Sequence, residues 1–146
     1  MAELLSDAEM SKWVTWKRAT EMVLADIESI ISSATGLSAG DFAVLTRVVE
    51  EPGQRIRQQR LSDQLGWERS RLSKHLDRMA NRGLISRDGN LTERTITPTS
   101  HGTVLAHQAR VIHADAVRSR LLTHVPELAT DDFWLVLKAL SRPAAS

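Results

Sequence analysis

Residues 58–87, QQRLSDQLGWERSRLSKHLDRMANRGLISR, contain two short helical patterns with a glycine between them. In the first pattern, Leu61 and Leu65 lie about one helical turn apart, and Gly66 follows as a turn residue. In the second pattern, over about 68–82, apolar residues recur at the i, i+4 and i+7 spacing of one helix face. They are Leu72, Leu76 and Met79. The stretch therefore predicts a helix-turn-helix.

A hairpin is predicted directly after the second helix. Residues 84–87 and 95–97 favour extended structure, and Asp88-Gly89 between them is a strong turn signal. Ile56 is placed to add a short bridge before the first helix. The expected fold class is therefore mainly α with a small β-wing, a winged helix-turn-helix lobe.

Charge is segregated along the chain. Residues 54–94 carry ten of the 19 Lys and Arg residues against five acidic residues, whereas residues 1–53 carry four basic and nine acidic residues. An ordinary solvated surface would spread the two signs more evenly. A basic stripe that coincides with a helix-turn-helix is typical of a module that neutralises DNA phosphates.

The second helix of this motif is the candidate DNA-reading element. Such helices present their first turns to base edges in the major groove, where Arg and Lys donate to guanine and Ser suits either base or phosphate. The wing follows the DNA backbone or the minor groove. The candidate DNA-binding residues are Arg69, Ser70, Arg71, Ser73, Lys74, Arg78, Arg87 and Arg94.

Long helical patterns flank this lobe. Residues 6–9, SDAE, have the form of a capping box, and apolar residues then follow a helical period as far as Gly36. After the wing, Thr99 and Ser100 are candidate caps for a helix that reaches about residue 123, and residues 130–132, TDD, are expected to cap a last helix through Leu140. The expected domains are an N-terminal dimerisation helix (1–36), a winged helix-turn-helix lobe (37–98) and C-terminal dimerisation helices (99–146).

The outer helices predict a homodimer. Their apolar faces, which include Trp13, Trp16, Phe133 and Trp134, exceed what one winged-helix lobe can bury. A two-fold dimer would place two recognition helices about one DNA turn, ~34 Å, apart and so read a palindromic operator in double-stranded DNA. The alternative is that these helices close a monomeric core.

The arrangement resembles the multiple antibiotic resistance regulator (MarR) family over nearly the whole chain. Residues 37–45, LSAGDFAVL, look like that family's entry helix, residues 61–66, LSDQLG, match its Leu-Ala-x-x-Leu-Gly, and residues 77–87, DRMANRGLISR, match its Asp-Arg-Leu-Glu-x-Arg-Gly-Leu-Ile-x-Arg. Residues 99–102, TSHG, fit the Thr-x-x-Gly that opens the family's long dimerisation helix. The wing's usual Asp-x-Arg falls on residues 92–94, TER, so Arg94 is present and Thr92 replaces the aspartate that helps to hold it.

The resemblance implies homodimers joined through the first and last helices, with a small aromatic or phenolic acid as effector. Such a pocket would lie between the dimerisation helices and the DNA-binding lobe, and would be apolar with a few polar anchors. The candidate lining residues are Trp13, Trp16, Phe42 and Arg47, with Lys17 as a further anchor. Aromatic residues at helical spacing are also ordinary core residues, so both interpretations stay open.

Other classes of function find no support in the sequence. The chain has no cysteine, so thiol redox sensing is excluded. His101, His107 and His113 recur every six residues, which points successive rings in different directions and predicts no metal site. No nucleotide-binding or nucleophile motif is present, so neither an enzyme nor a cofactor is expected. No apolar run approaches the ~18 residues of a membrane span, and no export signal is recognisable, so cytoplasmic localisation is expected.

The sequence therefore predicts a DNA-binding transcription regulator, a homodimeric repressor that a small aromatic ligand releases. One alternative is a winged-helix module that mediates protein interaction or dimerisation. A second is a DNA-binding activator without ligand control.

Overall fold

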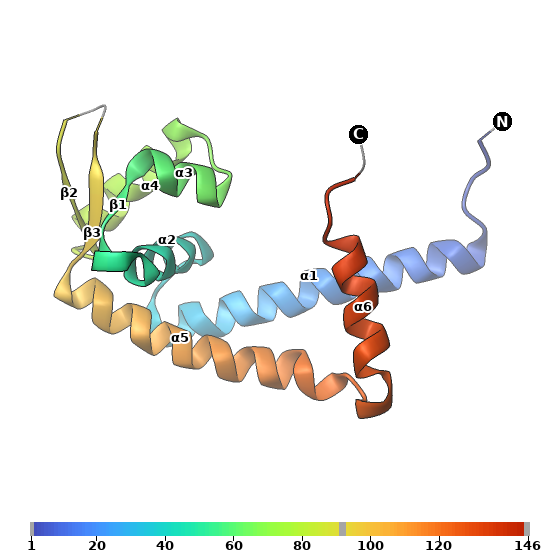
Figure 1. The fold of residues 1–146 in the computed structure, drawn as a ribbon. Helices are drawn as coiled ribbons and strands as arrows, with labels where there is room; N and C mark the ends of the chain where they lie inside the picture. The colour runs from blue at the N-terminus through green and yellow to red at the C-terminus, as the bar shows by residue number, and fades with distance from the viewer. Residues whose placement is uncertain (1, 91–92, 145–146) are drawn as a thin grey trace. The chain divides into compact units, whose positions relative to one another are not determined.

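The computed structural model describes residues 2–90 and 93–144. Within these residues, helices dominate and a small antiparallel sheet forms the wing, which confirms the predicted fold class (Figure 1). The α-helices are α1 Asp7–Thr35, α2 Ala39–Glu50, α3 Gln58–Leu65, α4 Arg69–Asn81, α5 Ser100–Arg120 and α6 Thr130–Leu140. The strands are β1 Ile56–Arg57, β2 Ile85–Asp88 and β3 Thr95–Pro98, and the short 3-10 turns are η1 Pro52–Gln54, η2 Leu122–His124 and η3 Glu127–Ala129.

The chain divides into two compact units. One is Glu28–His113, and the other is formed by the residues before and after it. The unit Glu28–His113 holds the expected lobe, 37–98, together with the end of α1 and the first two thirds of α5. Ile31 of α1 and Ala106 and Ala109 of α5 are buried in it. The lobe therefore uses parts of both flanking helices to complete its core.

The wing is a three-stranded sheet in the order β1-β3-β2. Antiparallel pairing places Ile56 opposite Ile96 and Ile85 opposite Pro98. Pro98 lies at the end of β3, where a residue without a backbone N–H is tolerated. The predicted hairpin and the short bridge at Ile56 are both confirmed.

Helix boundaries follow local capping chemistry. At α1, the backbone N–H of Ser6 donates to Glu9 Oε2 (2.8 Å) and the N–H of Glu9 donates to Ser6 Oγ (3.3 Å), which confirms the predicted capping box. At the other end, Gly36 adopts φ +74°, the left-handed conformation that ends a helix at low cost in glycine. The predicted start and end of α1 are therefore both found.

The core of the lobe lies beneath α4. Leu72, Leu76 and Met79 are fully buried, as the helical spacing predicted, and they face buried residues of the neighbouring helices and strands. Those residues include Val44, Leu45, Val48, Leu61, Leu84 and Ile96. The burial of this one face fixes which side of α4 is turned outward.

The start of α5 is held against the end of α4. Thr99 Oγ1 donates to the carbonyl of Gly83 (2.6 Å) and accepts from the backbone N–H of Gly102 (2.9 Å), so the predicted cap is confirmed. Gly102 lies so close to Leu84 that a Cβ atom there would overlap the Leu84 carbonyl oxygen. A glycine is therefore required by space and not by backbone conformation.

The C-terminal helices differ in detail from the prediction. The α-helix α5 ends at Arg120, three residues before the expected residue 123, because the chain tightens into η2. Thr130 is the first residue of α6 and not its cap; the cap position is Ala129, and Thr130 Oγ1 donates to the carbonyl of Pro126 (2.9 Å).

The second unit exposes apolar side chains on both of its main helices. On α1, Trp13 and Trp16 are 50% and 41% exposed, and on α6 Leu135 is 67% exposed. Arg120 of α5 pairs with Asp26 of α1 within the same unit. Trp13 and Trp16, which the sequence predicted to be exposed, are therefore uncovered in the single chain, whereas Phe133 and Trp134 of α6 are partly buried.

Gly102→Ala should destabilise the protein by about 3 kcal/mol, because the methyl group must displace backbone at Leu84. This cost should exceed the ~1 kcal/mol by which alanine favours a helix over glycine. Gly36→Ala is the matched control, since its Cβ meets nothing within 4 Å and only the left-handed backbone costs about 1–2 kcal/mol. Urea unfolding followed by circular dichroism measures both; equal losses would contradict the close approach.

Candidate nucleic-acid interface

A hollow of about 550 Å³ opens between the first turns of α3 and α4 and the wing. Its lining is mostly polar and includes three arginines, and it contains residues from β1, α3, α4 and the end of the hairpin. The lining residues are Arg57, Gln58, Gln59, Ser62, Arg69, Ser70, Leu72, Ser73, Glu93 and Arg94. The helix-turn-helix and the wing thus contribute to one concave surface.

Four of the eight candidate DNA-binding residues line this hollow. They are Arg69, Ser70, Ser73 and Arg94. Glu68, the cap residue of α4, makes no side-chain hydrogen bond to the helix within the described residues, so its side chain leaves the N–H groups of the first turn unoccupied. Cationic side chains beside a helix N-terminus form a surface that attracts anions.

The other candidate residues on α4 lie outside the hollow. Lys74 is exposed. Arg71 is also exposed, and its guanidinium lies 4.2 Å from the centroid of the Trp67 ring. Arg78 Nη2 lies 3.3 Å from His75 Nδ1. These cations follow the outward face of α4 beyond the hollow.

Arg87 occupies a different environment from the other candidates. Its side chain is 14% exposed and forms an ion pair with Asp77 of α4. This pair joins β2 to α4. The geometry gives Arg87 a role in holding the wing, and leaves it less accessible than Arg69 or Arg94.

The wing arginine is anchored through its backbone. The carbonyl of Arg94 accepts from the N–H of Gln58 (2.8 Å), which joins the hairpin to the start of α3. The N–H of Glu93 donates to Asn90 Oδ1 (3.0 Å). Thr92, which replaces the expected aspartate, lies outside the described residues. Glu93 places one carboxylate at the edge of the hollow.

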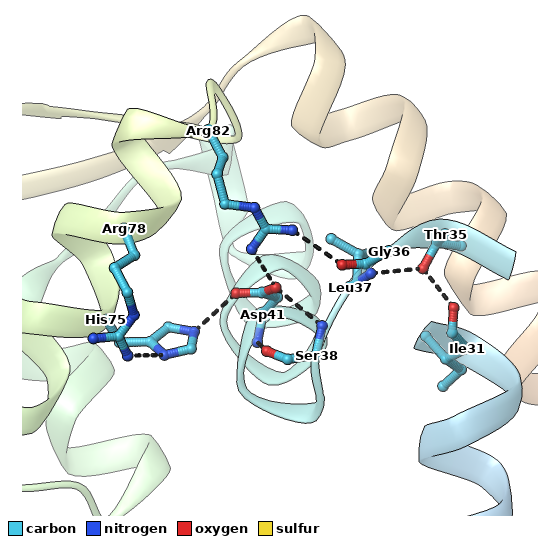
Figure 2. A network of polar contacts seen from close by, with 9 residues as sticks. All are labelled: Ile31, Thr35, Gly36, Leu37, Ser38, Asp41, His75, Arg78 and Arg82. Carbon is cyan, nitrogen blue, oxygen red and sulfur yellow. Dashed lines mark hydrogen bonds and ion pairs between the residues drawn. The ribbon is translucent and has the colours of Figure 1, made fainter. Parts of the chain in front are cut away.

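A buried carboxylate lies between the end of α4 and the start of α2 (Figure 2). Asp41 Oδ2 accepts from Arg82 Nη1 (2.6 Å) and from the backbone N–H of Ser38 (3.0 Å), and the N–H of Asp41 donates to Ser38 Oγ (3.1 Å). Arg82 Nη2 also donates to the carbonyl of Gly36 (3.0 Å). His75 Nε2 lies 3.0 Å from Asp41 Oδ1, without the alignment of a hydrogen bond. The network ties both α4 and the end of α1 to the start of α2.

The charges in this network are set by their neighbours. Burial alone would raise the pKa of Asp41, but the hydrogen bonds from Arg82 and Ser38 and the charge of Arg82 outweigh it and lower that pKa. Burial lowers the pKa of His75, and the positive charges of Arg78 and Arg71 lower it further. Together these effects outweigh the attraction of Asp41, which raises the pKa. At neutral pH the network therefore holds an ionised Asp41 beside a neutral His75.

The sequence did not identify several residues of this surface. Arg57, Gln58 and Gln59 line the hollow, and only the general basic charge of residues 54–94 pointed to one of them. A Ser-x-x-Asp spacing such as Ser38 to Asp41 is typical of a helix start, but nothing in it shows that the carboxylate is buried or that Arg82 is its partner.

The candidate effector-pocket residues fall in both compact units. Trp13 and Trp16 belong to the unit of the chain ends, whereas Phe42 and Arg47 belong to Glu28–His113. The ring of Phe42 lies 5.1 Å from that of His113, and Arg47 Nη1 donates to the carbonyl of Ala43 (3.2 Å). Phe42 and Arg47 thus have structural partners, and the pocket stays a prediction.

Neither a metal-binding group nor a membrane-spanning helix occurs in the described ranges. No group of three His, Asp or Glu side chains there is placed to hold a metal ion. No helix in the same ranges is long and apolar enough to cross a membrane.

Solved structures with this fold are numerous. AbsC, a MarR family transcriptional regulator from Streptomyces coelicolor, superposes with a TM-score of 0.83 at 24% identity, over 96% of this chain and 94% of that one. Sco3205, a MarR family regulator from the same organism solved in complex with DNA, gives 0.82 at 18% identity, over 99% and 95%. This chain has the fold of the MarR family transcriptional regulators.

Another solved structure that is similar to this chain holds a small molecule. CouR from Rhodococcus jostii RHA1, bound to p-coumaroyl-CoA, has a TM-score of 0.70 at 22% identity and covers 99% of both chains. No family model and no curated protein matches the sequence of this chain. The match to the MarR fold therefore rests on similarity of the backbone structure and not on similarity of the sequence.

Asp41→Asn should destabilise the protein by about 2 kcal/mol at pH 7, because it removes the charge that Arg82 hydrogen-bonds. Since the pKa of Asp41 is lowered in the folded state, its contribution is complete above the ordinary value of about 3.9 and is lost as pH falls through the lower, folded value. The difference between the two proteins should therefore shrink in acid.

Asp115→Asn is the control for this change, because Asp115 forms an exposed ion pair with Arg118. It should cost less than about 1 kcal/mol. Chemical unfolding at several pH values measures both variants. A loss for Asp41→Asn that matches the control, or that grows in acid, would show that the network does not hold α4.

Proposed function

We propose that this protein is a homodimeric transcription regulator that binds double-stranded DNA by sequence, acts without enzymatic activity in the cytoplasm, and represses its target until a small aromatic ligand releases it. The observation that carries the proposal is the concave basic surface at the start of α4 and the wing. Its cations come from three separate places in the chain: Arg57 from β1, Arg69 from α4, and Arg94 from the residue directly before β3. Cations that come from separate parts of the chain and line one hollow are suited to contact several phosphates of a DNA backbone.

Each element has a separate part in this proposal. The outward face of α4, with Ser70, Arg71 and Lys74, would enter the major groove and contact base edges. Arg69, Ser73 and Arg94 would hold phosphates around that helix, since phosphate contacts position and base contacts specify. Arg78 would add a further contact beyond the first turns. Arg87 would act through its ion pair with Asp77 to hold the wing.

The neighbouring structures support this proposal through their ligands. Sco3205 was solved with DNA, and CouR was solved with p-coumaroyl-CoA, a ligand with an aromatic acyl group. Both share the MarR fold with this chain. We therefore propose an aromatic effector, with Trp13, Trp16, Phe42 and Arg47 as the residues to examine first.

The proposed dimer would use residues 1–36 and 99–146, around a DNA-binding lobe at 37–98. The exposed apolar residues of α1 and α6 support it, because contiguous exposed apolar surface marks an interface. A two-fold axis would give two copies of the basic surface and so favour an inverted repeat.

Recognition-helix and wing variants should fail in different ways. Lys74→Ala should cost roughly 1–3 kcal/mol at the operator and relax the preference at particular base pairs. Arg94→Ala should weaken binding to all sequences alike and reduce the log-log salt slope by about one unit, since it would remove one phosphate contact.

Arg110→Ala is the matched control for these variants, because Arg110 is a surface arginine that pairs with Glu50 and does not line the hollow. Titrations of labelled DNA at several salt concentrations measure all three. Unchanged affinity and salt slope for Arg94→Ala would remove the wing from the interface.

The dimer should dissociate when charge is placed on its apolar face. Trp13→Glu with Leu135→Glu should yield monomers in sedimentation experiments and weaken operator binding, because two exposed apolar side chains of the proposed interface become charged. A wild-type protein that sediments as a monomer and still binds an inverted repeat tightly would contradict the dimer.

A further inference from the structure

Trp67 lies beneath a candidate base-reading arginine. It occupies the turn between α3 and α4 and is partly buried, and the guanidinium of the exposed Arg71 lies 4.2 Å from its ring centroid. A guanidinium stacked on an aromatic face keeps its N–H donors in its own plane, where they stay free to donate at the edge. Arg71 is therefore fixed in place without loss of its hydrogen-bonding edge.

The indole of Trp67 is itself held on several sides. The His75 ring meets it edge to face, with centroids 5.3 Å apart and an interplanar angle of 75°. The carbonyl of Trp67 accepts from the buried Ser62 Oγ (2.7 Å). These contacts fix both the ring and the backbone of Trp67, on which the guanidinium of Arg71 lies.

Gly40 supplies the space that the two rings need. A Cβ atom at this position would lie 2.7 Å from His75 Cε1 and 3.2 Å from Trp67 Cη2. Gly40 has ordinary helical backbone, so the requirement is one of space alone. The start of α2 is therefore shaped to receive His75 and Trp67.

The support continues into the buried carboxylate (Figure 2). His75 Nε2 lies 3.0 Å from Asp41 Oδ1, and Asp41 accepts from Arg82 at the end of α4. A continuous series of contacts thus runs from the exposed guanidinium of Arg71 through Trp67 and His75 to Asp41.

We propose that Trp67 is a positioning residue that holds the guanidinium of Arg71 for base reading, and that the Trp67–Arg71 stack determines specificity at one base pair of each half-site. The proposal rests on the proposed DNA-binding function. The arginine side chain is flexible, and a stack that restricts it before binding reduces the rotamer entropy that must be lost on DNA. A bidentate contact to guanine O6 and N7 needs this fixed plane.

The test compares Trp67→Leu, Trp67→Phe, Arg71→Ala and Arg71→Lys with the intact wild-type protein. Each is titrated against the DNA sequence that the wild type selects and against every single-base variant of it. Trp67→Leu removes the aromatic face and no charge, Trp67→Phe keeps an aromatic face, and Arg71→Lys keeps the charge but not the planar donor edge. Arg110→Lys is the control for the last change.

Trp67→Leu, Arg71→Ala and Arg71→Lys should each lose about ten-fold of the discrimination at the same base pair. Discrimination elsewhere should be unchanged, and Trp67→Leu should keep the wild-type salt slope. Trp67→Phe should retain most of the preference. The double variant Trp67→Leu/Arg71→Ala should discriminate no worse than Arg71→Ala, because both act on one contact.

Three results would overturn the proposal: Trp67→Leu weakens all sequences alike, the effects of the two residues add, or Arg71→Lys retains full discrimination. Arg71→Lys changes an exposed side chain and leaves the indole in place, so it decides the question even where Trp67→Leu fails to fold. If the wild type selects no DNA sequence, the proposed function fails together with this inference. A selected sequence whose preference ignores both residues would overturn this inference alone.

Discussion

The ionised carboxylate of Asp41 is the contact on which the arrangement of the lobe depends. It is buried, and a buried charge costs free energy unless its oxygens are hydrogen-bonded. Here one oxygen accepts from Arg82 and from the backbone of Ser38, and the other faces His75. Because these partners belong to α4 and to the start of α2, the carboxylate fixes the two helices to each other.

Apolar burial and ion pairs both determine how α4 is exposed at the surface: burial sets its rotation, and ion pairs hold its neighbours in place. The buried face of Leu72, Leu76 and Met79 sets the rotation of the helix, and so turns its basic side outward. The wing is joined to the same helix through Arg87 and Asp77, and to α3 through the backbone of Arg94 and Gln58. The cations of the hollow therefore sit on elements that are fixed against one another, which lowers the entropy that binding must overcome.

Most of the fold could be predicted from the sequence because its signals are local. The spacing of apolar residues in α4, the Asp88-Gly89 turn and the box at Ser6 each depend on a few consecutive residues. The contacts that hold the site are not local: Asp41 and Arg82 are 41 residues apart, and neither periodicity nor charge indicates their pairing.

The same limit applies to the site residues. The charge of Arg87 makes it a candidate for DNA contact in the sequence. Its ion pair with Asp77 forms because β2 lies beside α4, and the sequence does not show that arrangement. Gly40 and Trp67 gave no signal, because their roles depend on the packing of two rings against a helix start.

The most direct test of the account is selection of DNA from a random double-stranded library by the purified protein. The account predicts one enriched inverted repeat, with half-sites whose centres lie about one DNA turn, ~34 Å, apart. Enrichment of no sequence, or of a single unrepeated half-site, would contradict it.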